Sequence, residues 1–150
     1  MAQASASIDL PVSADIVWHL IGGFNSLPDW MPYIQKSETT EGARVRHLAT
    51  PNNETIVERL EKFDNAARSY SYSIIQAPFP ITDYLSTISV RQKAGESGCL
   101  VEWSGTFIAK SVSDSEASKL FKGIFEDGLK ALAARFARSR RLSIPGAAKR

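Results

Sequence analysis

Residues 113–138 read SDSEASKLFKGIFEDGLKALAARFAR, and this stretch decides the fold. Its apolar or small side chains recur every three or four positions, which is the spacing of a helix with one buried face. Ser113 and Glu116 stand three positions apart, as in a capping box that satisfies free N–H groups of the first helical turn. A helix of this length needs an apolar partner surface as long as a small domain. The expected buried stripe consists of Ala117, Leu120, Phe121, Ile124, Phe125, Gly128, Leu129, Leu132 and Phe136.

Gly128 interrupts this stripe, because glycine inside a helix costs up to about 1 kcal/mol relative to alanine. Two explanations are open. A bulky neighbour packs closely against the glycine, which we favour, or the glycine leaves space for a ligand.

The preceding residues are expected to supply the partner surface as a sheet. Residues 2–10 are expected to form a first strand, residues 13–21 a short helix that ends at Gly22 and Gly23, and residues 24–32 one capped turn. The inner face of the short helix is expected to carry Ile16, Val17, Leu20 and Ile21. Six further segments have the length of strands and are separated by turn residues, namely 33–39, 43–50, 55–63, 68–75, 82–91 and 99–110.

Short connections between these segments predict antiparallel hairpins. A twisted antiparallel sheet of this size curls, so a helix laid across its concave side encloses the core. The predicted fold class is therefore α+β, with a seven-stranded curved antiparallel sheet, two short helices and a long C-terminal helix packed across the sheet, enclosing a cavity. Residues 1–138 form a single domain in this interpretation, and residues 139–150 form a flexible basic tail.

Composition excludes several classes of function. The apolar fraction of 43% and charged fraction of 23% are ordinary for a globular protein, and no apolar run approaches the roughly 20 residues of a membrane span. The first residues lack the basic and apolar regions of a signal peptide, so we expect a cytoplasmic location. The basic excess lies after position 134, where no acidic residue occurs, so it does not indicate a nucleic-acid-binding patch. The sequence leaves a homodimer open.

Glu58 is the most informative polar residue of the predicted strands. Side chains alternate between the two faces of a strand, so Glu58 shares a face with Ile56 and Leu60, a costly place for a carboxylate. On the preceding strand Arg46 shares a face with Leu48, and a hairpin would bring Arg46 and Glu58 within reach of each other. The pair is either functional or purely structural.

Two other strands combine hydroxyl groups with apolar side chains on one face. Such a mixture is typical of the wall of a ligand pocket. One face carries Tyr84, Ser86, Ile88 and Val90. The other carries Tyr70, Tyr72 and Ile74, for which plain packing is the favoured interpretation.

Motifs for cofactor chemistry are absent from the sequence. His19 and His47 have no partners at metal-ligand spacing, and there is no phosphate loop, nucleophile elbow or dinucleotide fingerprint. We therefore expect no metal and no cofactor. The single cysteine, Cys99, cannot form an intrachain disulfide and is interpreted as a packing residue.

Four segments resemble the polyketide cyclase/dehydrase-like family, which belongs to the helix-grip superfamily of START lipid-transfer domains and the major birch pollen allergen. They are residues 78–84 (PFPITDY), 95–98 (GESG), 101–107 (VEWSGTF) and 125–129 (FEDGL). The resemblance covers residues 3–138. It implies a seven-stranded antiparallel sheet that grips the C-terminal helix, with a hydrophobic cavity between them.

The middle of the chain is also similar to plant lachrymatory factor synthases, which rearrange a small sulfenic acid. The similar segments are 45–47 (VRH), 57–64 (VERLEKFD), 68–72 (RSYSY) and 99–104 (CLVEWS). This resemblance implies that Arg46, Glu58 and Tyr84 match the pocket arginine, glutamate and tyrosine of these enzymes. The loop 78–80 resembles bacterial members of the family instead, so the reaction is not carried over.

Together these observations predict a pocket protein that performs cofactor-free cyclisation, dehydration or isomerisation of a small hydrophobic molecule. Glu58 would be the general acid/base, Arg46 would hold a ligand oxyanion and orient Glu58, and Tyr84 would donate a hydrogen bond at the mouth. A non-catalytic carrier or sensor and a solidly packed interaction domain are the alternatives. The expected ligand-binding residues are Ile56, Leu60, Tyr70, Tyr72, Phe79, Ile88, Trp103, Phe121, Phe125 and Gly128.

Overall fold

Seven strands and two α-helices follow one another in the computed structural model, which describes residues 1–143. A single 3-10 turn, η1, lies between α1 and β2. The bounds are β1 Ala2–Leu10, α1 Ala14–Ile21, η1 Leu27–Asp29, β2 Lys36–Thr40, β3 Val45–Ala49, β4 Thr55–Asp64, β5 Ser69–Gln76, β6 Ile81–Gln92, β7 Cys99–Ala109 and α2 Asp114–Ser143.

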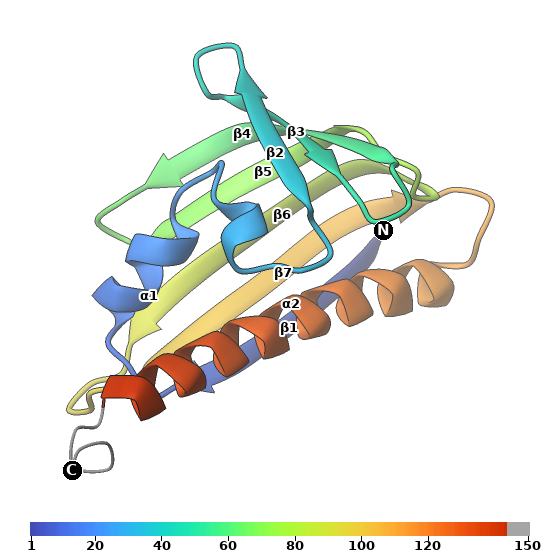
Figure 1. The fold of residues 1–150 in the computed structure, drawn as a ribbon. Coiled ribbons are helices and arrows are strands. Elements are labelled where there is room, and N and C mark those ends of the chain that lie inside the picture. The colour runs from blue at the N-terminus through green and yellow to red at the C-terminus, as the bar shows by residue number, and fades with distance from the viewer. Residues whose placement is uncertain (144–150) are drawn as a thin grey trace.

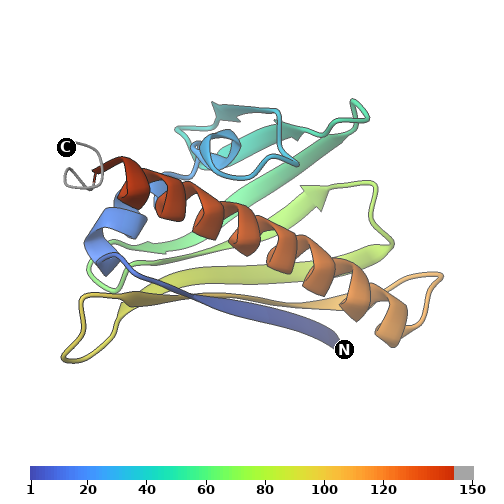
Figure 2. The same cartoon turned by 60° about the horizontal axis from the view of Figure 1, so that its bottom comes forward.

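All seven strands form one antiparallel sheet in the order β1-β7-β6-β5-β4-β3-β2. Consecutive strands from β2 to β7 pair as hairpins, as their short connections predicted, and β1 pairs with β7 at the far edge. The sheet curls, and α2 lies along its concave side (Figures 1 and 2). The predicted curved, seven-stranded antiparallel sheet with a long C-terminal helix packed across it is confirmed. β2 begins later than predicted, because the backbone N–H of Ile34 bonds to the carbonyl of Met31 in a turn after η1.

Helix α2 buries its predicted apolar stripe except at Leu120 and at Ile124, which is half-buried. Its N-cap is also as predicted, because Oγ of Ser113 accepts a hydrogen bond from the backbone N–H of Glu116 at 3.0 Å. Leu120 was predicted to be buried and is 38% exposed, because it lies at the edge of the stripe. The helix continues past the predicted end at residue 138 to Ser143, and residues 144–150 of the predicted tail lie outside the described residues. The buried residues are Ala117, Phe121, Phe125, Gly128, Leu129, Leu132 and Phe136.

Gly128 is in tight contact with the indole ring of Trp103 on β7. A Cβ atom at position 128 would lie 2.9 Å from Cζ3 of Trp103, closer than such atoms approach in practice. The ring of Trp103 stacks on Phe125 with 4.7 Å between the ring centroids. The favoured explanation for the glycine, close packing by a bulky neighbour, is therefore correct.

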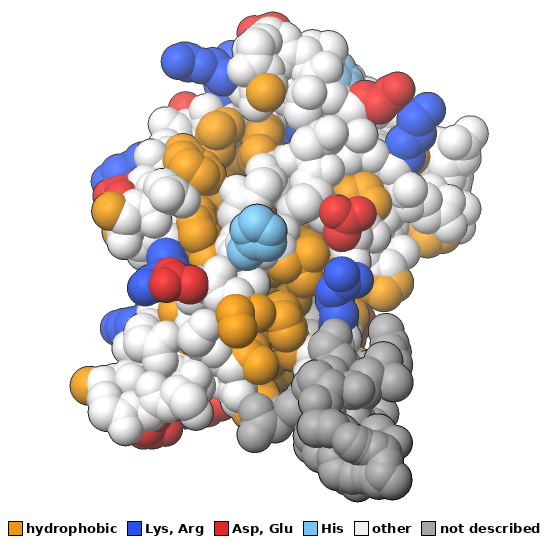
Figure 3. Space-filling view, turned by 60° about the vertical axis from the view of Figure 1, so that its left-hand side comes forward, with side chains coloured by type: hydrophobic (Ala, Val, Ile, Leu, Met, Phe, Trp, Pro, Cys, Tyr) orange, Lys and Arg blue, Asp and Glu red, His pale blue; other side chains and the backbone are white. Residues whose placement is uncertain are grey.

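The inner face of α1 differs from the prediction at Ile16, which is 55% exposed. The face that packs on the sheet consists of Ala14, Val17, Trp18 and Ile21, and Leu20 is half-buried. These four follow the i, i+3, i+4, i+7 rule when counted from Ala14. On the side of the molecule that carries α1, apolar side chains reach the surface between charged ones (Figure 3). Within residues 1–143, neither α1 nor α2 has the length and apolar content required of a bilayer-spanning helix.

Candidate functional site

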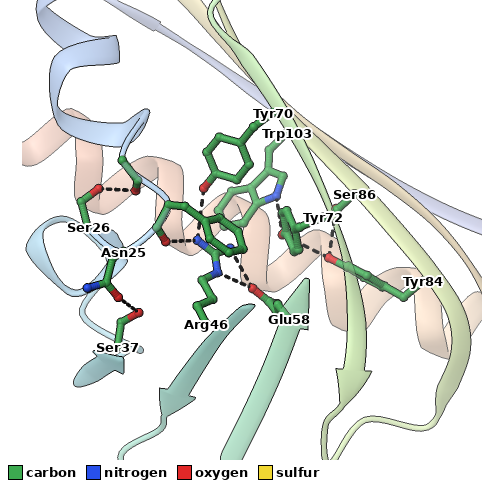
Figure 4. Close-up of polar contacts among 12 residues, drawn as sticks. Asn25, Ser26, Ser37, Arg46, Glu58, Tyr70, Tyr72, Tyr84, Ser86 and Trp103 are labelled. Atoms are coloured by element: carbon green, nitrogen blue, oxygen red, sulfur yellow. Dashed lines mark hydrogen bonds and ion pairs between the residues drawn. The ribbon is translucent and has the colours of Figure 1, made fainter. Parts of the chain in front are cut away.

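Arg46 and Glu58 face each other across the hairpin of β3 and β4. Their Cα atoms are direct register partners, a detail that strand parity left open. Both side chains lie on the concave side, where Arg46 is 1% and Glu58 is 7% exposed. Figure 4 shows the two side chains extending from neighbouring strands toward the rings of Tyr70, Tyr72 and Trp103. The sheet therefore carries an ion pair inside its apolar core.

The guanidinium of Arg46 binds only one oxygen of the carboxylate. Nε donates to Oε1 of Glu58 at 2.8 Å, and Nη2 lies 2.7 Å from the same oxygen. Oε2 accepts no hydrogen bond from any described residue. Oε2 is not completely buried. The only completely buried side-chain nitrogen or oxygen without a partner in residues 1–143 is Nε1 of Trp30. One oxygen of Glu58 is therefore held and the other is free.

The rest of the guanidinium is held by structural contacts. Nη1 donates to the backbone carbonyl of Phe24 at 2.7 Å and to the hydroxyl of Tyr70 at 3.3 Å. Cζ of Arg46 lies 4.2 Å from the ring centroid of Phe24 and 4.9 Å from that of Tyr72, which adds cation–π attraction. Three of the five N–H groups of Arg46 thus donate hydrogen bonds to described residues, and Nη2 adds an ion-pair contact with Glu58. Arg46 thus positions Glu58 more than it offers free donors.

Burial and charge act in opposite directions on this pair. Burial raises the pKa of Glu58, and the attraction of Arg46 offsets only part of that rise. Burial alone would lower the pKa of Arg46, but Tyr70 and Glu58 outweigh it, so that pKa is raised. The guanidinium therefore stays charged, and Glu58 is the member of the pair whose carboxyl group is more easily protonated than an exposed one.

A chain of hydrogen bonds runs beside the ion pair. The indole N–H of Trp103 donates to the hydroxyl of Tyr72 at 3.0 Å, which lies 3.4 Å from the hydroxyl of Tyr84. Tyr84 donates to Oγ of Ser86 at 3.0 Å, and Ser86 donates to the carbonyl of Ser104 at 2.8 Å. The chain ends on a backbone carbonyl, which can only accept a hydrogen bond. The donor and the acceptor of each hydrogen bond along the chain are therefore determined. Tyr72 therefore donates to Tyr84.

Both tyrosines of this chain are neutral hydrogen-bonding groups. Burial raises the pKa of Tyr72 and the pKa of Tyr84 well above the usual range, and the charge of Glu58 contributes to both shifts. Tyr84 is 4% exposed, so the structure places its hydroxyl inside the core, beside Tyr72. Its hydroxyl proton is already donated to Oγ of Ser86.

The space beside Glu58 is small. A cavity of about 40 Å³ lies between α2 and the sheet, well below the few hundred Å³ expected for a ligand. A groove of about 420 Å³ lies next to it, between α2, the segment 31–33 and Phe79. The expectation of an open, ligand-sized hollow at Glu58 is therefore wrong, because side chains fill the interior. The residues that line both spaces are Met31, Tyr33, Phe79 and Ile124.

Most of the predicted site residues meet at the inner cavity. Leu60, Tyr70 and Ile88 do not line it. Tyr70 pairs with Ile88 and its ring contacts Trp18 of α1, so these residues lie farther along the strands. Gly128 lines the outer groove. Lining the inner cavity are Arg46, Glu58, Tyr84, Ile56, Tyr72, Phe79, Trp103, Phe121 and Phe125.

Sequence reasoning missed several lining residues. Leu48 and Ile74 could have been included, because each shares a strand face with a residue that was selected. Met31 lies in the segment 24–32, for which the sequence predicted only one capped turn, and Tyr33 was predicted to begin a strand that in the structure starts at Lys36. The missed residues are Leu27, Met31, Tyr33, Ile34, Leu48, Ile74 and Ile124.

Other reactive groups lie elsewhere. Cys99 is fully buried, and burial raises the pKa of its thiol, in line with a packing role. No group of three or more His, Cys, Asp or Glu side chains in residues 1–143 could hold a metal ion.

A family model matches the chain and names the family that the sequence segments resembled. A model described as polyketide cyclase / dehydrase and lipid transport matches residues 1–137. The chain belongs to this family. The resemblance that the segments in residues 78–129 indicated is therefore confirmed. None of the curated proteins that were compared matches the chain.

Solved structures share the fold of this chain. The protein XoxI from Bacillus cereus is 57% identical over 91% of this chain and 96% of its own, with a TM-score of 0.89. A START superfamily protein from Mycobacterium smegmatis is 17% identical over 92% of this chain and 99% of its own, with a TM-score of 0.75. Norcoclaurine synthase from Thalictrum flavum is 18% identical over 91% of this chain and 86% of its own, with a TM-score of 0.69. The last two share the fold.

Proposed function

We propose that the chain binds a small hydrophobic molecule between α2 and the sheet and performs cofactor-free acid/base chemistry on it with Glu58. The observation that carries this proposal is the free Oε2 of a buried carboxyl group whose other oxygen is fixed by Arg46. The family description, which covers cyclases, dehydrases and lipid transport, fits a protein with an internal ligand. Norcoclaurine synthase, which shares the fold, has been solved with dopamine and hydroxybenzaldehyde.

In this proposal each polar residue has a role. Oε2 of Glu58 would take a proton from a carbon or hydroxyl of the ligand and return it at a neighbouring atom, as cyclisation, dehydration and isomerisation require. Arg46 holds Oε1 and so fixes the direction of Oε2. To donate to a developing oxyanion, Tyr84 would have to turn its O–H away from Ser86 and toward the ligand. A positioned general acid/base typically contributes about 10²- to 10⁴-fold in rate.

A ligand must open the interior to reach Glu58. The cavity of about 40 Å³ holds little more than a water molecule, so side chains at its boundary with the groove have to move. Phe79 is half-buried on the loop before β6 and packs edge-on against Phe121, with 5.2 Å between the ring centroids. Displacing Phe79 would join the inner cavity to the groove of about 420 Å³.

A non-catalytic carrier is the second candidate, and a specific observation favours it. Three N–H groups of Arg46 already donate hydrogen bonds within the protein and Nη2 is in ion-pair contact with Glu58, as expected of a fixed structural anchor. In a carrier, Oε2 of Glu58 would only accept a hydrogen bond from the ligand. A cytoplasmic location fits either function and stays a prediction.

The test combines ligand identification with one isosteric substitution. Native mass spectrometry of freshly purified protein would give the mass of a co-purifying hydrophobic molecule, which is then offered to the wild type, Glu58→Gln and the control Glu61→Gln. Glu61 lies on the same strand and is exposed. We expect Glu58→Gln to keep binding and lose turnover, with Glu61→Gln unchanged. Turnover equal to wild type in Glu58→Gln would remove Glu58 from the mechanism, and binding without turnover in the wild type would establish the carrier.

A further inference from the structure

The groove outside the inner cavity carries negative charge and no positive charge. Asp127 on α2 is the only charged side chain among its lining residues, and it is exposed. Glu54 does not line the groove, but it is exposed and within electrostatic range of Tyr33 on the opposite wall, where its charge adds to the effect of burial in raising the pKa of Tyr33. Neither carboxylate forms an ion pair with a described residue, so both charges are available to a ligand.

The groove is continuous with the proposed site. Four residues, Met31, Tyr33, Phe79 and Ile124, line both spaces. A third carboxylate, that of Glu58, lies at the inner end. Its side chain is 9% exposed, and its Oε2 accepts no hydrogen bond from a described residue. The only cation there, Arg46, is almost completely engaged within the protein. A ligand that spans both spaces therefore meets carboxylates at each end.

From this arrangement we infer the chemical class of the ligand: a hydrophobic amine, with its apolar body between Ile124 and Phe79 and its ammonium group at the outer end, near Asp127 and Glu54. This inference rests on the proposed function, because it assumes that the groove and the inner cavity are one site. The ring of Tyr33 also lines the groove and adds an aromatic surface, which favours a cation. Carboxylates and phosphates of the same size are repelled at the groove.

Three probes with one apolar body test this charge preference. They are 2-(1-naphthyl)ethylamine, 2-(1-naphthyl)ethanol and 1-naphthylacetic acid, which differ in the charge of the side chain. Isothermal titration calorimetry at low ionic strength should give the order amine, alcohol, acid from tightest to weakest. Since each of the two exposed charge pairs contributes about 0.2–1 kcal/mol, the amine should bind about two- to thirtyfold more tightly than the alcohol. Salt should reduce this ratio.

Substitutions locate the effect. The double variant Glu54→Gln with Asp127→Asn should remove the preference for the amine and leave the affinity for the alcohol unchanged. Glu126→Gln is the matched control, because Glu126 is the exposed neighbour of Asp127 on α2 and does not line the groove. Ala131→Phe fills the groove from a half-buried position and should weaken binding of all three probes at least tenfold.

The outcomes separate this inference from the function on which it rests. Binding of the alcohol that Ala131→Phe abolishes, with no preference for the amine over the acid, would overturn the inference and leave the proposed pocket in place. A preference for the amine that survives in the double variant would overturn it too. If none of the probes binds and no molecule co-purifies, the proposed function fails first.

Discussion

Trp103 on β7 and Gly128 on α2 fit together so closely that no side chain can stand at position 128 without displacing the indole ring. Trp103 also stacks on Phe125, contacts Trp30 and donates its N–H to Tyr72. The contact between helix and sheet is therefore made at the same residue that begins the hydrogen-bond chain of the site.

Gly128→Ala should destabilise the protein, although alanine favours a helix. The added Cβ would lie 2.9 Å from an indole ring that is held on several sides, and overpacking of this kind costs about 1–3 kcal/mol. Helix propensity returns at most about 1 kcal/mol. Gly123 is the control, because a Cβ there meets no atom within 4 Å, so Gly123→Ala should stabilise by up to about 1 kcal/mol. Urea unfolding of both variants measures this, and equal stabilisation would contradict the close fit.

Glu58 should make stability depend on pH in a defined direction. Because its pKa is raised in the folded state, its proton is bound more tightly there than in the unfolded chain. The stability from this proton is fully present below the usual pKa of glutamate, about 4.3, and is lost as the pH rises through the raised value. The free energy of unfolding of the wild type minus that of Glu58→Gln should therefore fall as the pH rises from about 4. A rising difference would mean that Arg46 dominates and lowers the pKa.

Removing Arg46 should be far more costly than replacing the whole pair. Arg46→Met leaves Glu58 buried and unpaired, which typically costs about 3–5 kcal/mol. The double variant Arg46→Met with Glu58→Leu should recover much of this loss, because an apolar pair needs no desolvation of charge. Arg59→Met is the control, since the ion pair of Arg59 with Glu41 is largely exposed and is expected to contribute less than about 1 kcal/mol. Thermal unfolding would show it, and a double variant no better than Arg46→Met would contradict this account.

Gly105 and Ser86 should be coupled. A Cβ at position 105 would lie 2.7 Å from Oγ of Ser86, so Gly105→Ala should push this hydroxyl away from Tyr84 and destabilise the fold by about 1–3 kcal/mol. Ser86→Ala alone should cost about 1–2 kcal/mol, because it leaves the hydroxyl of Tyr84 without its acceptor. The double variant should lose less than the sum of the two, because the closest clash is gone. Additive losses in denaturant unfolding would show that the two positions act independently.

Much of the fold follows from patterns that are local in the sequence. The apolar stripe of α2 and the Ser113 cap are set by neighbouring residues, and strand alternation alone placed Glu58 and Arg46 on the inner face. Alternation cannot give the register of two strands, because register depends on the geometry of the turn at residues 50–54. Direct pairing of Arg46 with Glu58 therefore had to come from the structure.

The size of the cavity was beyond sequence reasoning for a different reason. The residues that fill the interior beside Glu58, such as Met31 and Phe79, come from loops whose course has no periodic signal. The burial of Ile16 was mispredicted for a similar reason. The eight residues of α1 contain two overlapping apolar stripes, and packing on the sheet buries the stripe that starts at Ala14.

The bond from Arg46 to the carbonyl oxygen of Phe24 uses a main-chain atom, which substitution at position 24 does not remove. The side chain at position 46 must therefore carry a planar group that reaches both the carbonyl of Phe24 and the carboxylate of Glu58. A lysine ammonium has neither the shape nor the number of donors for this. Arg46 thus links the loop after α1 to the carboxyl group of Glu58. A change in the packing of α1 can therefore alter the pKa of Glu58 without any direct contact.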